Sequence, residues 1–262
     1  TTSFTVTFTN AGTYMVRCYE TDTTTGNYSL SAIWEDGGHA FSASDPCLGT
    51  LENGSTLVGN IDQAGDMDGA WLTVEAGDVV CIRGADRTGS SSFVLAMDMF
   101  NENGVSIASS SGDVTAGFTV TFTNAGTYLV RCYETDVTTG GFSLSALWLD
   151  DGHALSASDT NVGGLTNGVA RSGSIGQVGD VDAAYFSATN NQAVTVLMTD
   201  TTGSSSFVAL ANLYGPDGKY IIGASGNTSA QFSTVCTNAG QYTILLMETD
   251  VTTGGYTVKV TY

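Results

Sequence analysis

A regular internal repeat constrains this chain more than any other feature of its sequence. Asn10, Asn124 and Asn238 each begin an Asn-Ala-Gly turn, and they are 114 residues apart. No insertion or deletion is needed between the copies. A repeat of this length is an ordinary domain that can bury its own core. The sequence therefore predicts a string of domains rather than a solenoid of short repeats.

The repeat divides the 262 residues into a fragment and two complete units. Residues 1–34, here the N-terminal segment, match residues 115–148 at 27 of 34 positions. They correspond to the C-terminal strands of one unit. Residues 35–148 form the first unit and residues 149–262 the second unit.

Apolar and polar residues alternate throughout each unit, which predicts strands. The stretch FTVTFT at 118–123 places three apolar side chains on one face and three threonines on the other. After a turn at 124–126, the residues Tyr128, Val130 and Cys132 share one face of a returning strand. Further strands are expected at 71–74, 79–82, 93–100 and 142–148. About seven to nine short strands per unit are typical of an antiparallel β-sandwich.

The charge balance excludes two classes of partner. The chain has 26 acidic and 7 basic residues, a net charge of −19. Nucleic acids and anionic membranes both require clusters of lysine and arginine, so neither is expected as a partner. A strongly acidic surface instead favours cations. No apolar run is long enough to span a membrane, and no leader peptide is recognisable. Because the chain starts at Thr1, we expect that a leader was removed or that the sequence is part of something longer.

The cysteines predict one disulfide. None of the five cysteines forms a Cys-x-x-Cys pair, which argues against a zinc or redox site made of thiols. Cys81 and Cys132 occur together in the first unit, whereas the second unit has Thr195 and Leu246 in their places. This joint replacement predicts a Cys81–Cys132 bridge and hence an oxidising, extracellular setting. The alternative is two separate buried thiols.

Several motifs taken together resemble the bacterial pre-peptidase C-terminal (PPC) domain family. In the second unit they are DDGH at 150–153, GSIGQVGDVDAAYFSA at 173–188, LANLYGPDGK at 210–219 and NAGQYTILLMETDVTTGGYTVKV at 238–260. The resemblance covers both units and the N-terminal segment. It implies tandem jelly-roll-like antiparallel β-sandwiches that are secreted and non-catalytic. Related modules bind calcium or insoluble polymers such as collagen, but no peptidase domain accompanies the modules in this sequence.

Paired aspartates predict a Ca²⁺ site in each unit. In both units a Gly-Asp-x-Asp stretch precedes an aromatic strand, and acidic residues open the unit. Carboxylate oxygens are the hard ligands that Ca²⁺ prefers, and the family resemblance points the same way. The alternative is an acidic turn in which Asp68 or Asp182 accepts backbone hydrogen bonds. The candidate ligands are Asp36, Asp66, Asp68, Asp150, Asp151, Asp180 and Asp182.

No catalytic constellation is recognisable, so we expect no enzyme activity. His39 and His153 are the two histidines, each in the linker before a unit, and neither has an obvious nucleophile to activate. The sequence contains no HExxH or GxSxG motif. A hydrogen bond within the linker is the expected role of both. Glu134 and Asp136 begin an acidic loop that recurs in each copy, and bonding to its own backbone explains it as well as an ion does.

The N-terminal segment leads to two hypotheses of function. Its apolar face has no expected cover, because both full units own equivalent strands. We expect this face to pack on a neighbouring copy, so that the protein self-assembles into an extracellular filament, sheath or surface polymer. The alternative is a binding or adhesion module of a larger secreted enzyme or adhesin, attached to a polymeric substrate. The predicted interface residues are Phe4, Val6, Phe8, Tyr14, Val16 and Cys18.

If Cys81 and Cys132 pair, three cysteines are left over. These are Cys18, Cys47 and Cys236. Bridges among them would link the chains of a polymer.

Overall fold

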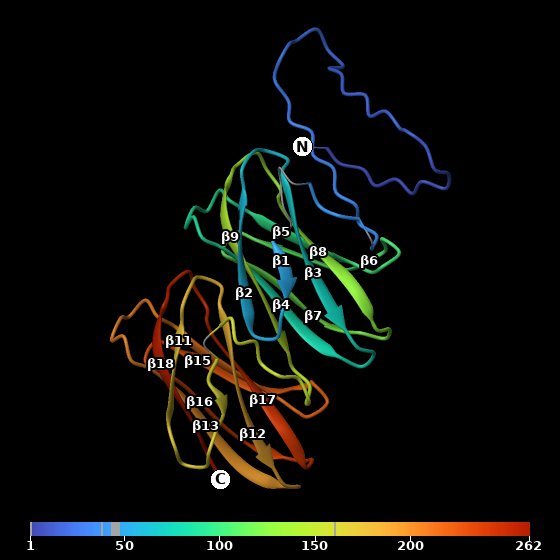
Figure 1. Ribbon diagram of the computed structural model, residues 1–262. Coiled ribbons are helices and arrows are strands. Elements are labelled where there is room, and N and C mark those ends of the chain that lie inside the picture. Colours follow the sequence, from blue (N-terminus) through green and yellow to red (C-terminus); the bar gives the residue numbers. More distant parts are fainter. Residues whose placement is uncertain (1, 38, 43–47, 160) are drawn as a thin grey trace.

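The computed structural model describes residues 2–37, 39–42, 48–159 and 161–262, which contain strands and no helix. Figure 1 shows two β-sandwich units stacked on each other. The strands of the first unit are β1 (Gly49–Leu51), β2 (Ser55–Ile61), β3 (Met67–Val74), β4 (Val79–Asp86), β5 (Leu95–Phe100), β6 (Ser106–Gly112), β7 (Thr115–Thr121), β8 (Gly126–Glu134) and β9 (Gly140–Trp148). Those of the second unit are β10 (Gly163–Gly164), β11 (Arg171–Ile175), β12 (Val181–Ala188), β13 (Gln192–Asp200), β14 (Ala209–Tyr214), β15 (Tyr220–Gly226), β16 (Ser229–Cys236), β17 (Gly240–Glu248) and β18 (Gly254–Thr261). The predicted fold class, tandem antiparallel β-sandwiches, is confirmed.

The two units have the same strand order. In the first unit one sheet has the order β1-β3-β8-β5-β6 and the other β2-β9-β4-β7. The second unit repeats both orders as β10-β12-β17-β14-β15 and β11-β18-β13-β16. Consecutive strands of the chain often lie in different sheets, as in a jelly roll. Only the short β1–β3 and β10–β12 pairs are parallel among the described ladders.

Each unit has its own core between its two sheets. Phe93, Phe122 and Phe142 are fully buried in the first unit. The predicted face of β8 is confirmed, because Tyr128, Val130 and Cys132 all belong to this core. The ring of Phe142 on β9 also restricts which residue can occupy the paired position on β2. A methyl group at Gly59 of β2 would overlap the ring of Phe142, so only glycine fits there.

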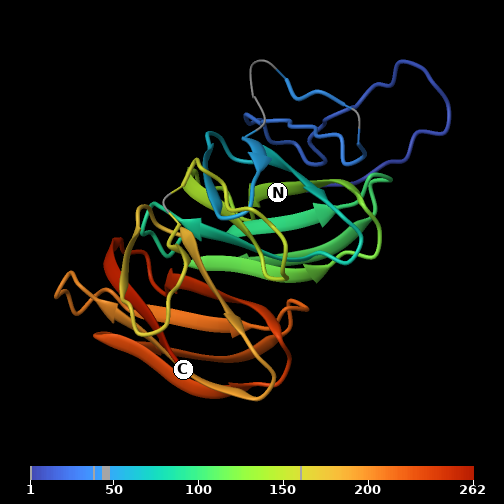
Figure 2. The ribbon, with the colours of Figure 1, turned by 60° about the horizontal axis from the view of Figure 1, so that its bottom comes forward.

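A third apolar cluster joins the two units. The outer face of the first unit's four-stranded sheet contributes Val79 and Leu147, with Leu149 directly after β9. The outer face of the second unit's five-stranded sheet contributes residues such as Tyr214 and Leu245. All of these side chains are buried. Figure 2 shows the same arrangement, with the second unit packed sheet against sheet on the first.

Buried hydrogen bonds also cross this interface. The Nη2 atom of Arg83 donates to the backbone oxygen of Glu248 at 2.8 Å. The hydroxyl of Ser145 donates to the backbone oxygen of Gly179 at 3.0 Å. Because apolar packing and buried polar bonds are continuous here, the units form one body rather than two beads on a flexible linker.

The strands predicted in the N-terminal segment are absent. Residues 2–34 form no strand and extend away from the first unit as an open loop, as Figure 1 shows. The reason lies in the topology. This segment corresponds to β7, β8 and β9. In the first unit β7 pairs with β4, β8 pairs with β3 and β5, and β9 pairs with β2 and β4. The three strands do not pair with one another. None of the described residues supplies the N-terminal segment with a counterpart of those partner strands.

The turn of the N-terminal segment does form. The hydroxyl of Tyr14 donates to the backbone oxygen of Asn10 at 2.7 Å. The equivalent bonds from Tyr128 to Asn124 and from Tyr242 to Asn238 measure 3.0 and 2.9 Å. The local sequence is therefore sufficient for the turn, whereas the strands need partners from elsewhere in a unit.

The predicted Cys81–Cys132 disulfide is wrong, because both thiols are free. Cys81 lies on β4 with its side chain against the apolar cluster between the units, and Cys132 lies on β8 inside the first unit's core. A sheet separates side chains that point to opposite faces. Burial raises the pKa of both thiols. Of the three remaining cysteines, Cys18 is exposed, Cys236 is buried and Cys47 lies outside the described residues.

Among the described residues, no helix has the length and hydropathy needed to cross a membrane.

The interface between the units predicts coupled unfolding. The side chain of Leu149 is fully buried in the apolar cluster between the units. We expect Leu149→Ala to lower the free energy of unfolding by about 2–5 kcal/mol through a cavity at this position. Differential scanning calorimetry should show one transition for the unchanged protein and two separated transitions for the variant.

The control is Ile107→Ala, because Ile107 is 40% exposed on β6. This change should alter stability by no more than about 0.5 kcal/mol. Equal effects of the two substitutions would contradict a stabilising interface.

Candidate metal centre

Three carboxylates converge at the edge of the second unit. Asp180 and Asp182 stand where the chain enters β12, and Asp159 comes from the linker that precedes β10. One carboxylate oxygen from each lies within 4.8 Å of the others. We call these three residues the carboxylate cluster.

Hydrogen bonds from other groups hold three of the cluster's carboxylate oxygens in place. Asp180 Oδ2 accepts the N–H of Gly176 at 2.8 Å, which closes the turn before β12. Asp180 Oδ1 accepts the hydroxyl of Thr56 at 2.8 Å. Thr56 belongs to the first unit, so the cluster lies at the interface between the units. Asp182 Oδ2 accepts the hydroxyl of Tyr256 at 2.5 Å.

One oxygen in the cluster has no partner. The side chain of Asp182 is fully buried, and its Oδ1 has no hydrogen-bond partner among the described residues. A buried charged oxygen without compensation is costly. The cost is met either by a proton or by a cation.

The pKa values show how strongly the cluster disfavours negative charge. Burial raises the pKa of Asp182 to about 8; the bond from Tyr256 lowers it, and the charges of Asp180 and Asp159 raise it further. Burial also raises the pKa of Asp180 to about 6, against the bonds from Gly176 and Thr56. The donor set consists of hard oxygens alone, which suits Ca²⁺ rather than a softer metal. The residues therefore fit the predicted calcium ion.

The first unit has a different environment at the equivalent positions. Asp66 is buried and accepts the N–H groups of Asp62 and Met67, both at 2.9 Å. Asp68 is also buried. The residue equivalent to Tyr256 is Phe142, so the hydroxyl that meets Asp182 has no counterpart here.

The other predicted ligands lie elsewhere. The sequence predicts that Asp150 and Asp151 join Asp180 and Asp182 in one site. In the structure they lie outside the group that contains Asp180 and Asp182. Asp150 instead accepts the N–H of Val79 and approaches His153. Asp151 is exposed. Asp36 lies 3.6 Å from His39, in the same relation as Asp150 to His153. The cause is the path of the linker after β9, which places Asp150 against the turn between β3 and β4 of the first unit.

The repeated acidic loops have a structural role. Glu134 is buried, and its two carboxylate oxygens accept the N–H groups of Val94 and Thr138 at 3.3 and 3.2 Å. Glu248 makes the equivalent bonds in the second unit. Each glutamate therefore bonds to the backbone of its own loop, as one of the two interpretations predicted, and also to the backbone of the segment before β5 or β14.

The sequence reasoning missed Asp159. Nothing in its local sequence marks it as a ligand, because it stands alone in a linker rich in serine and alanine. The repeat does contain a signal, since Asp45 stands 114 residues earlier at the equivalent position. Asp45 itself lies outside the described residues.

Comparisons with known proteins do not establish a family. No family description matches the chain, and no curated protein matches it. One similar solved structure is the pre-peptidase C-terminal domain of a collagenase from Bacillus anthracis, at 16% identity and a TM-score of 0.32, over 39% of this chain and 95% of that one.

Two other solved structures contain carbohydrate-binding modules by name. The CBM22-1-CBM22-2 tandem domain of Paenibacillus barcinonensis Xyn10C is 12% identical with a TM-score of 0.25, over 79% of this chain and 86% of that one. A Clostridium perfringens ZmpB structure with an M60 catalytic domain and CBM51 domains is 8% identical with a TM-score of 0.26, over 88% and 37%. TM-scores this low carry no argument about family or function. Membership of the PPC family stays a prediction.

The carboxylate cluster predicts an unusual pH dependence in the presence of a chelator. The pKa of an aspartate in an unfolded chain is about 3.9. In the folded protein the pKa of Asp180 is raised to about 6 and that of Asp182 to about 8. The protons thus stabilise the folded state fully below the unfolded pKa, and this stabilisation is lost as the pH rises through the folded pKa values. With chelator present, the midpoint temperature of thermal unfolding should therefore decrease as the pH rises from about 5 to about 9. Millimolar Ca²⁺ should restore this temperature at the highest pH.

Asp182→Asn is the matching variant. It should stabilise the chelated protein at high pH by on the order of 1–3 kcal/mol and reduce the stabilisation by Ca²⁺. Asp113→Asn, at an exposed aspartate, is the control and should change neither quantity. If both variants respond to Ca²⁺ as the unchanged protein does, the cluster is not the calcium site.

Proposed function

We propose that this chain is a non-catalytic module of an exported protein, which it attaches to a polymeric extracellular substrate. The observation that carries the proposal is the buried interface between the units. Apolar packing and buried hydrogen bonds join two complete sandwiches into one body. A rigid tandem of this kind presents two copies of the same surface at a fixed spacing, which raises the avidity for a repetitive polymer.

The carboxylate cluster supports the extracellular setting. Its Asp180 accepts a hydrogen bond from Thr56 of the first unit, so an ion in the cluster would strengthen the interface. Extracellular calcium modules work at about 10⁻⁴–10⁻³ M Ca²⁺, a concentration that is found outside cells. With the predicted disulfide absent, the extracellular setting rests on this cluster and on the acidic composition.

A second candidate function is self-assembly, favoured by the exposed apolar side chains of the N-terminal segment. Phe4 is 73% exposed and Tyr14 is 53% exposed. Val6, Phe8 and Val16 are also exposed, as is the Cys18 thiol. A neighbouring copy that covered this segment would bury apolar surface now in contact with water.

Electron microscopy and co-sedimentation of the intact chain separate the two functions. For an attachment module we expect dispersed short rods that sediment with insoluble collagen or with an insoluble polysaccharide, and that bind less with chelator. Ordered filaments without polymer binding would overturn this proposal and support self-assembly.

A variant in the N-terminal segment sharpens the comparison. Phe4→Asp places a charge on the exposed apolar face, so it should abolish filaments if they depend on that face. It should leave sedimentation with the polymer unchanged if the chain is an attachment module. The control is Val137→Asp, at a side chain that is 72% exposed in a loop of the first unit. On a non-reducing gel, covalent dimers that disappear in Cys18→Ser would be a further result in favour of self-assembly.

A further inference from the structure

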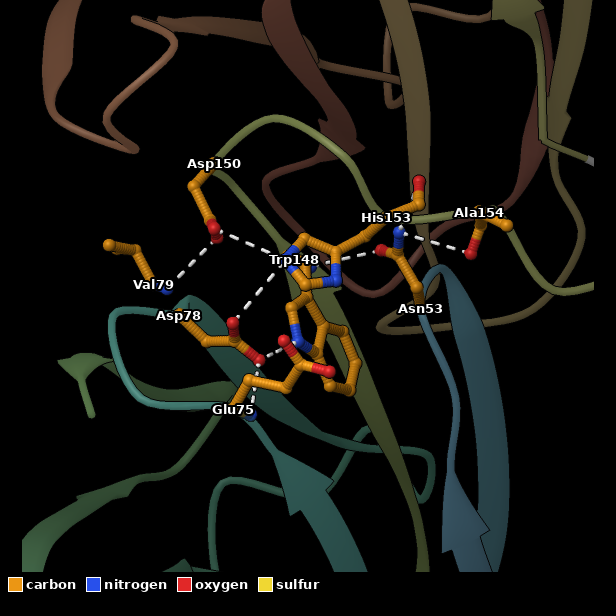
Figure 3. Close-up of polar contacts among 8 residues, drawn as sticks. All are labelled: Asn53, Glu75, Asp78, Val79, Trp148, Asp150, His153 and Ala154. Atoms are coloured by element: carbon orange, nitrogen blue, oxygen red, sulfur yellow. Dashed lines mark hydrogen bonds and ion pairs between the residues drawn. The ribbon is translucent and has the colours of Figure 1, made fainter. Parts of the chain in front are cut away.

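A second group of metal-ligating side chains lies where the linker meets the first unit. Asp78 stands in the turn between β3 and β4, and Asp150 and His153 stand in the linker that follows β9. One ligand atom from each residue lies within 4.8 Å of the other two. Figure 3 shows the three side chains pointing toward one another next to Trp148. We call these three residues the junction cluster.

Two distances in the junction cluster are close to those of a tetrahedral site. His153 Nε2 lies 3.1 Å from Asp150 Oδ2 and 3.4 Å from Asp78 Oδ1. In proteins Zn²⁺ binds nitrogen and oxygen ligands at about 2.0–2.2 Å, so two ligands of a tetrahedral site are about 3.3–3.6 Å apart. The two distances to His153 Nε2 therefore need to change by only about a few tenths of an ångström for an ion to bind there, and the two aspartate oxygens lie within 4.8 Å of each other.

The remaining carboxylate oxygens are held by other groups, which orients the ligands. Asp78 Oδ2 accepts the indole N–H of Trp148 and the backbone N–H of Glu75, both at 2.9 Å. Asp150 Oδ1 accepts the backbone N–H of Val79 at 2.9 Å. Each aspartate thus directs its other oxygen at His153. Fixed outer partners of this kind are typical of metal sites.

The junction cluster borders an acidic hollow that is open to solvent. The cavity has a volume of about 470 Å³ and includes all three cluster residues in its lining. Glu75, Asp151 and Asp217 add three more carboxylates. Such a lining attracts cations, and the open side leaves room for water as a fourth ligand.

We propose that Asp78, Asp150 and His153 bind a Zn²⁺ ion that fastens the linker to the first unit. The imidazole decides the type of metal, because Ca²⁺ takes oxygen ligands, whereas imidazole suits zinc and neighbouring transition metals. The junction cluster therefore differs in chemistry from the carboxylate cluster, which offers oxygens alone. An ion here would hold the second unit in place, since Asp150 and His153 lead directly into it.

The repeat supplies a natural comparison. The linker before the first unit contains Asp36 and His39 at the positions equivalent to Asp150 and His153. The ring of His39 stacks on that of Trp34 with 4.5 Å between the centroids, and His39 Nε2 lies 3.6 Å from Asp36 Oδ2. No third ligand accompanies this pair in the clusters found among the described residues. In the second unit the position of Asp78 is occupied by Gln192, which cannot replace a carboxylate ligand. The proposal thus assigns one such site to this chain.

The test is Co²⁺ and Zn²⁺ binding by the intact chain in excess Ca²⁺. Cobalt replaces zinc at such sites, and a tetrahedral site gives strong visible absorption. We expect one Co²⁺ per chain, displaced by Zn²⁺. His153→Gln should weaken Co²⁺ binding by more than about tenfold and remove the visible bands, because it deletes a ligand. His39→Gln is the matched control and should leave both unchanged.

Asp78→Asn provides a second variant in case His153→Gln does not fold. Thermal unfolding and circular dichroism establish that each variant is folded before binding is measured. Absence of tetrahedral Co²⁺ bands in the unchanged protein would overturn the proposal and leave an ion pair between His153 and two aspartates. Bands that persist in both folded variants would also overturn it. Loss of Ca²⁺ binding in Asp182→Asn tests the other cluster and would leave the zinc result unchanged.

Discussion

Strand pairing between distant parts of each unit is the constraint on which the rest of this structure depends. β7, β8 and β9 pair with strands from the first half of the unit and not with one another. These late strands are therefore stable only when a whole unit is present. The N-terminal segment illustrates the point, because a similar sequence forms three strands of a sandwich at 115–148 and an open loop at 2–34.

The same topology determines how the units stack. The four-stranded sheet of the first unit packs its outer face on the five-stranded sheet of the second. This contact joins different surfaces, so it is of the head-to-tail type that continues in one direction. The second unit does not have the residues with which the first unit makes this contact. Arg83, Asp78 and Cys81 correspond to Leu197, Gln192 and Thr195. The differences between the copies therefore mark the interface more clearly than their identities do.

The stacking also explains where the acidic residues gather. Both clusters lie at the boundary between the units, but they differ in composition. The carboxylate cluster combines a buried unpaired oxygen of Asp182 with a bond from the first unit's Thr56. The junction cluster adds an imidazole and an open cavity. Ions at these places would act on the relative position of two sandwiches rather than on a substrate. This agrees with a module whose purpose is attachment.

The sequence by itself determined the repeat, the sandwich class and the faces of strands such as β8, whereas a calcium-binding role for Asp180 and Asp182 stays a prediction. These follow from spacing and alternation, which are local properties of a chain. Only the tertiary structure decided which sheet each strand joins. Alternation assigns Cys81 and Cys132 each to one face of a strand, but it cannot say which face turns toward the core. Cys132 points into the core and Cys81 points out of it, so the predicted disulfide was wrong. Alternation likewise could not bring Asp159 to Asp182, or Asp78 to His153. Those contacts form because strands and linkers far apart in the sequence meet when two sheets close on one core and a second unit packs against them.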